Sequence, residues 1–142
     1  DAVLALLRNR LMENVTAVRQ ETPDALGRLK SLLMRHVRML AENRAIPHVI
    51  FSDGMYTGHP ERKAKVRDIM HCYLGEVMRI VQEGQQAGAV RREIDPKATS
   101  VMFLGMILPA AVLWSVSGGD FDVVAHAKNA WPTFERGIAA GM

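Results

Sequence analysis

The stretch VMFLGMILPAAVLWSV, residues 101–116, carries no charged side chain and one hydroxyl group. It lies within an uncharged run of 22 residues between Lys97 and Asp120, about the length of a helix that spans a bilayer. Such a segment is a membrane span, the centre of a helical core, or a helix buried between two chains. The rest of the sequence distinguishes these three interpretations.

The flanks of this run argue against a membrane span. The run includes Thr99, Ser100 and Pro109, and acidic residues border it as often as basic ones. A membrane anchor is expected to have a basic cytoplasmic flank. A helix that is apolar on all sides must instead be covered on two faces. We therefore predict no membrane contact and a helix that its own domain covers on one face.

Length and composition indicate one globular domain over residues 1–142, with 49% apolar and 23% charged residues. The net charge of +3 is small and spread along the chain, so these residues are not expected to bind nucleic acid themselves. Cys72, the single cysteine, excludes an internal disulfide, indicates a reducing cytoplasm and is expected to be a buried thiol. No signal peptide is expected, since no basic-then-apolar leader opens the chain.

Apolar residues recur at helical spacing through the chain, and no segment alternates as a strand does, which predicts an all-α bundle of about five to six helices. Residues 1–19 carry the first stripe, and a second stripe includes Leu26, Leu33 and Val37. A short element is expected to begin at Pro47. A long helix is expected to run to Gly88, with an apolar stripe that includes Ile69, Tyr73 and Val77. Helix starts are predicted at Thr22-Pro23, Asp95-Pro96 and Asp120.

The last two predicted helices, residues 96–117 and 120–140, have too little charge for a free surface. A two-fold dimer would bury this surface in a four-helix interface, whereas a central helix in a monomeric bundle is the alternative. Pro109 and Pro132 are each expected to kink their helix, since proline removes a backbone donor. The candidate interface residues are Gly105, Leu108, Val112, Ala127, Ala130, Phe134 and Gly137.

Residues 80–107, IVQEGQQAGAVRREIDPKATSVMFLGMI, resemble the effector-domain signature of the TetR/AcrR family of bacterial transcriptional regulators. The matching positions are Gly84, Gly88, Asp95, Pro96 and Gly105. The closing AWPTFERGIAAGM is similar to the family's last helix. The resemblance implies a homodimer, a small-molecule effector and contact with operator DNA through a helix-turn-helix that this sequence does not contain. Residues 1–19 would then link the domain to that head.

Nine methionines in 142 residues are typical either of an adaptable apolar pocket or of core gap-filling. We favour a pocket for a small hydrophobic effector, with Tyr73 as a polar handle and His36 as a second polar contact or a satisfied core histidine. The candidate ligand-binding residues are Val37, Phe51, Met55, Met70, Tyr73, Leu74, Met102 and Met106.

No catalytic motif, metal-binding spacing or cofactor fingerprint is recognisable, so the sequence predicts no enzyme, no metal and no cofactor. The favoured interpretation is the ligand-sensing and dimerisation domain of a TetR-like regulator, a repressor that a small apolar effector releases from DNA. The alternative is a free-standing helical module that sequesters a hydrophobic molecule. A helix-turn-helix upstream of residue 1 would favour the regulator.

Overall fold

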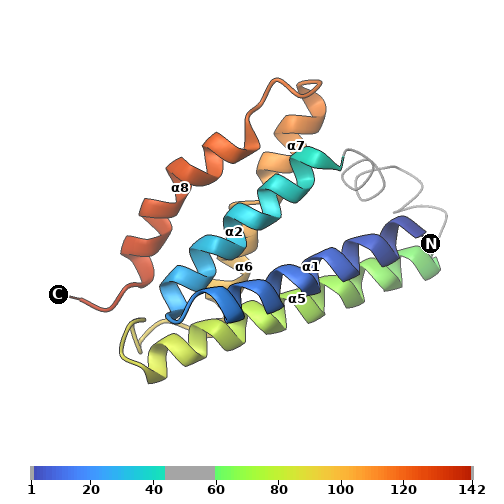
Figure 1. The fold of residues 1–142 in the computed structure, drawn as a ribbon. Coiled ribbons are helices and arrows are strands. Elements are labelled where there is room, and N and C mark those ends of the chain that lie inside the picture. Colours follow the sequence, from blue (N-terminus) through green and yellow to red (C-terminus); the bar gives the residue numbers. More distant parts are fainter. Residues whose placement is uncertain (1, 44–59, 142) are drawn as a thin grey trace.

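The computed structural model describes residues 2–43 and 60–141. These ranges form six α-helices without a named strand, which confirms the all-α prediction (Figure 1). The short element expected at Pro47 lies outside the described residues. The helices are α1 (Ala2–Glu21), α2 (Ala25–Glu42), α5 (Pro60–Gln86), α6 (Pro96–Gly105), α7 (Leu108–Val116) and α8 (Val123–Ile138).

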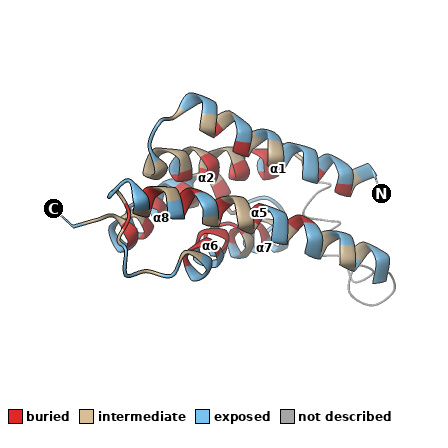
Figure 2. Ribbon diagram, turned by 90° about the horizontal axis from the view of Figure 1, so that it is seen from below, coloured by how far each residue is buried: buried red, intermediate tan, exposed pale blue. Residues whose placement is uncertain are grey.

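Helix α2 is central, because it packs against α1, α5 and α8. Helices α1 and α5 also contact each other and lie side by side along one edge of the bundle, and α6 packs against α5 (Figure 1). Every residue of the predicted α1 stripe is buried, as is most of the predicted α2 stripe. Buried positions on the helices face one another across the interior (Figure 2).

Three aspartates begin helices by accepting a hydrogen bond from the backbone N–H three residues later, which would otherwise lack a partner. Asp24 accepts from Gly27 at 2.9 Å, Asp95 from Ala98 at 2.9 Å, and Asp122 caps α8. The prediction at Asp95 is confirmed. The predictions at Thr22 and Asp120 were each wrong by two residues, because a second aspartate follows and provides the cap.

The predicted helix over residues 96–117 is interrupted in its middle. Met106 and Ile107 form a tight turn, in which the backbone N–H of Ile107 donates to Leu104 at 2.9 Å. Pro109 has no N–H and lies in the first turn of α7, where none is needed. The chain is thus interrupted at Met106 and Ile107, just before Pro109, where a kink within one helix was expected, whereas α8 continues through Pro132.

By length and composition alone, helices α6 and α7 together could cross a membrane. However, 44% of an 18-residue part of this stretch is buried inside the domain. A core helix with one uncovered face meets the same criterion. Phe103, Ile107 and Ala111 point into the bundle, whereas other apolar side chains of α6 and α7 are exposed. The exposed ones are Val101, Met102, Val112, Leu113 and Val116.

The C-terminal end of α5 packs closely against the start of α2 and against Val90, which in turn pairs with the segment after α8. A Cβ atom at Gly84 would lie 2.5 Å from Val90 Cγ2 and 2.8 Å from Ala25 Cβ, closer than real Cβ atoms approach. Val90 in turn forms an isolated antiparallel bridge with Ala139, and the Arg91 side chain donates to the Ala139 carbonyl at 2.9 Å. The absence of a side chain at Gly84 therefore permits α5, the start of α2 and the segment around Val90 to pack together.

We expect Gly84→Ala to lower the free energy of unfolding by about 1–3 kcal/mol, because the added methyl group overpacks this junction. The same substitution at Gly75, on the same helix and with no atom within 4 Å of the added Cβ, should raise it by about 0.5–1 kcal/mol through helix propensity. Urea unfolding of both variants measures the difference. Equal effects at the two positions would contradict the close packing at Gly84.

Candidate functional site

A hydrogen-bonded polar pair lies in the apolar interior between α2 and α5. His36 Nδ1 and the Tyr73 hydroxyl are 2.9 Å apart, and their rings meet edge to face with centroids 5.1 Å apart. Both side chains are buried, with exposed fractions of 5% and 1%. Sequence spacing could not reveal this pair, since the residues are 37 positions apart on different helices.

Burial keeps both members of the pair neutral. It lowers the pKa of His36 from 6.5 to about 4 and raises the pKa of Tyr73, because the low-dielectric interior disfavours each charged form. The other buried polar residues among those described are Thr99 and Ser100, whose hydroxyls donate to backbone carbonyls of Asp95 and Lys97. The buried polar residues among those described are therefore neutral, whereas the partly exposed Arg19 of α1 buries its Nη2 atom without a hydrogen-bond partner.

One of the candidate ligand-binding residues, Tyr73, is a member of this pair, and three others lie close to the pair in sequence on α2 and α5. Val37 and Tyr73 are fully buried in the core, and Met70 and Leu74 on α5 are partly buried against it. Phe51 and Met55 lie outside the described residues. The structure therefore brings the α2 and α5 candidates into one interior region.

The two candidates from the apolar stretch point elsewhere. Met102 is 63% exposed on the outer face of α6, and Met106 is largely buried at the α6–α7 turn. Both line an external groove rather than a cavity around the polar pair. The structure thus separates Met102 from the interior candidates.

That groove lies between α6 and α8 and has a volume of about 770 Å³. Four of the seven candidate interface residues line it: Gly105, Ala130, Phe134 and Gly137. Val112 is exposed on α7, and Leu108 is half-buried. Ala127 is fully buried in its own chain, so it presents no surface to a partner.

Cys72 is exposed, and the prediction of a buried thiol was wrong. The inward stripe of α5 consists of Ile69, Tyr73, Val77 and Ile80. Cys72 is adjacent to Tyr73 in the chain, and neighbouring helical residues point about 100° apart, so it falls on the solvent side.

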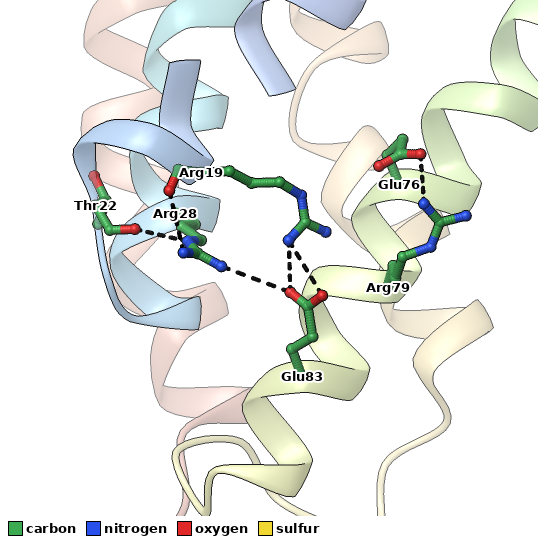
Figure 3. A network of polar contacts seen from close by, with 6 residues as sticks. All are labelled: Arg19, Thr22, Arg28, Glu76, Arg79 and Glu83. Atoms are coloured by element: carbon green, nitrogen blue, oxygen red, sulfur yellow. Dashed lines mark hydrogen bonds and ion pairs between the residues drawn. The ribbon is translucent and has the colours of Figure 1, made fainter. Parts of the chain in front are cut away.

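A network of arginines joins α1 and α2 to α5 (Figure 3). Glu83 Oε1 lies 2.8 Å from Arg19 Nη1 and 3.7 Å from Arg28 Nη1. Arg28 also donates from Nε to the Thr22 carbonyl at 2.6 Å, within the α1–α2 turn. Sequence spacing does not reveal this network, since its charges lie far apart along the chain. These contacts connect the C-terminal end of α1 to α5, the helix that carries Tyr73.

Among residues 2–43 and 60–141, no group of three or more His, Cys, Asp or Glu side chains is placed to hold a metal ion. Besides the neutral interior pair and the apolar groove between α6 and α8, the described residues form a polar groove of about 600 Å³ between α1 and α2, whose lining includes Arg10, Arg35 and Arg38.

Comparison with known proteins places these features in a family. A model of TetR C-terminal regions, described as "YsiA-like protein, C-terminal region", matches residues 7–136. The fatty acid metabolism regulator protein of Bacillus subtilis (strain 168) is 19% identical over 141 residues, which cover 97% of this chain and 72% of that protein.

Two solved structures share the fold. The transcriptional regulator FadR from Bacillus subtilis, in complex with stearoyl-CoA, has a TM-score of 0.78 and 20% identity, covering 97% of this chain and 75% of FadR. The ketosteroid transcriptional regulator KstR2 of Mycobacterium tuberculosis has a TM-score of 0.78 and 14% identity, covering 94% and 68% of the two chains. At sequence identities of 20% and 14%, these two matches show that the chain shares the fold of the two regulators, and no more than that.

Proposed function

This chain belongs to the C-terminal region of the TetR family of transcriptional regulators, and we propose from that premise that it senses a long-chain acyl-CoA and dimerises. The family match is the observation that carries the regulatory role. The relatives named above are transcriptional regulators, which supports a ligand-sensing regulator domain rather than an enzyme.

The acyl-CoA class is favoured by two independent features. The related B. subtilis FadR is described in complex with stearoyl-CoA. In this chain, the core between α2 and α5 is formed by aliphatic and thioether side chains, with His36 and Tyr73 as its neutral polar groups. A flexible hydrocarbon chain suits the adaptable side chains of Met70 and Leu74.

We propose that a second copy of the chain covers the α6–α8 groove, forming a four-helix interface. Small residues at Gly105, Ala130 and Gly137 permit close approach of helices, and the exposed apolar side chains of α6 and α7 would be buried with them. The proposed interface therefore includes the interface residues predicted from the sequence, except Ala127, which is buried in the core of its own chain.

The proposed mechanism is a shift between two packings of the bundle. An effector beside Tyr73 would favour one position of α5. The contact of Glu83 with Arg19 connects α5 to α1, and its contact with Arg28 connects α5 to α2. Helix α1 would pass the change to a helix-turn-helix outside this chain, which would release operator DNA. The proposed role implies a cytoplasmic protein that does not contact the membrane.

Thermal unfolding with stearoyl-CoA tests the effector class. At about 100 times its dissociation constant, the ligand should stabilise the chain by about 2.7 kcal/mol, a rise in Tm of about 5–10 °C. Leu74→Trp should remove this rise by filling the interior region, whereas Leu6→Trp, on an exposed position of α1, should retain it. No stabilisation of the wild type by stearoyl-CoA would contradict the proposed effector.

A further inference from the structure

The polar groove between α1 and α2 is formed by a face of α2 that differs from its core face. The two helices diverge from the turn that joins them (Figure 1). The α2 residues that line the groove recur every three to four positions, so they share one side of the helix. Apart from Met39, none of them is buried. The groove is therefore separate from the interior around Tyr73.

The lining of this groove concentrates the positive charge of the chain. Its eleven residues carry a net charge of +2, whereas all 142 residues carry +3. Arg10, Lys30 and Arg38 are exposed, and none of them forms an ion pair or side-chain hydrogen bond with a described residue. Arg35 donates from Nη2 to both carboxylate oxygens of Glu21, at 3.0 and 3.1 Å. A single exposed cation is balanced by solvent, but four in one groove repel one another unless an anion lies among them.

Two neutral polar side chains line the same groove, one on each helix. Asn14 on α1 and Ser31 on α2 are half-buried, and neither side chain hydrogen-bonds with a described residue. An amide and a hydroxyl both donate to phosphate oxygens, and guanidinium groups bind such oxygens in a two-pronged geometry. The lining thus combines cations with unused neutral donors, which is the set of groups that a phosphate ligand requires.

We propose that the groove between α1 and α2 binds a small molecule with two or more phosphate groups. Its volume of about 600 Å³ admits a ligand of nucleotide size, and the half-buried Met34 offers a thioether to an aromatic base. Glu21 ends α1 at the turn and Glu42 ends α2, so carboxylates border the lining, which disfavours a continuous polyanion such as duplex DNA. The inference is independent of the acyl-CoA proposal, because the groove shares no lining residue with the candidate interior region.

A series of ligands tests the dependence on phosphate. Calorimetry on the 142-residue chain in 50 mM NaCl measures the affinities of adenosine, AMP, ADP and pyrophosphate. We expect ADP to bind about 5- to 10-fold more tightly than AMP, and adenosine to bind more weakly than both. Pyrophosphate distinguishes the two sources of phosphate: affinity equal to that of ADP would indicate recognition of phosphates alone, and weaker affinity would indicate a nucleotide.

Variants of exposed residues test the groove without disturbing the core. Arg38→Gln should weaken ADP binding by about 5- to 20-fold, the range for losing a hydrogen-bonded charge. Arg8→Gln is the matched control, because Arg8 is also exposed and its loss changes the net charge equally, but it does not line the groove. Glu21→Gln should strengthen ADP binding by about 2- to 5-fold, since it frees Arg35 and removes a negative charge. A merely structural role would not produce this gain.

Three results would overturn the proposal. The first is an absence of ADP and pyrophosphate binding by the wild type, whatever its affinity for duplex DNA. The second is an affinity for adenosine equal to that for ADP. The third is equal weakening by Arg8→Gln and Arg38→Gln, which would reduce the effect to net charge. A chain that binds ADP but is not stabilised by stearoyl-CoA would keep the phosphate site and contradict the proposed effector alone.

Discussion

Gly137→Arg is expected to convert a dimer at micromolar concentration into a monomer. Gly137 is exposed on α8 and lines the groove with Gly105 and Ala130, and nothing lies within 4 Å of a Cβ added there. The substitution should therefore be tolerated by the single chain. In a helix contact it would bury an unpaired charge, and we expect the dissociation constant to rise by about 100-fold or more.

Sedimentation equilibrium over a concentration series measures this change. Asn129→Arg is the matched control, because Asn129 is also exposed on α8 but does not line the groove, and this variant should remain dimeric. Unfolding midpoints of the monomeric variant should show that it is still folded. A wild-type chain that sediments as a monomer at micromolar concentration would refute the proposed interface.

Periodicity predicted the fold because burial in a helix repeats every three to four residues. Leu4, Leu7 and Leu11 are buried as the stripe required, and the long α5 follows its predicted face. Helix starts were less predictable, because Asp24 and Asp122 each stand two residues after another plausible cap. The choice between adjacent caps depends on backbone geometry that the packed helices impose.

The candidate site was predictable only in part, because its contacts join distant segments. Tyr73 was expected in the interior from its place on the α5 stripe, but its bond with His36 depends on how α2 and α5 cross. The apolar stretch of residues 101–116 has no polar face, so its sequence could not say which side meets a partner. Packing against α5 and α8 decides this, and it leaves Met102 outside.

We expect the free energy of unfolding to fall by about 3 kcal/mol as the pH decreases from 6.5 to 4, through His36 alone. Burial lowers the pKa of His36 in the folded chain to about 4, whereas in the unfolded chain it keeps its ordinary value of 6.5. Between these values the unfolded chain binds a proton that the folded chain does not, so acid favours unfolding. Well above pH 6.5, His36 is neutral in the folded and the unfolded chain, so it no longer contributes to the pH dependence of stability.

Comparison of variants separates this effect from that of the carboxylates, which also titrate toward pH 4. His36→Gln removes the titrating group, so its stability should fall less steeply than that of the wild type over the same range. His71→Gln alters an exposed histidine on α5 and should follow the wild-type curve. Urea unfolding at half-unit pH intervals measures all three slopes. Parallel curves for His36→Gln and the wild type would show that His36 is protonated as readily in the folded chain as in the unfolded one. The interior around Tyr73 would then be polar enough to hold a charge.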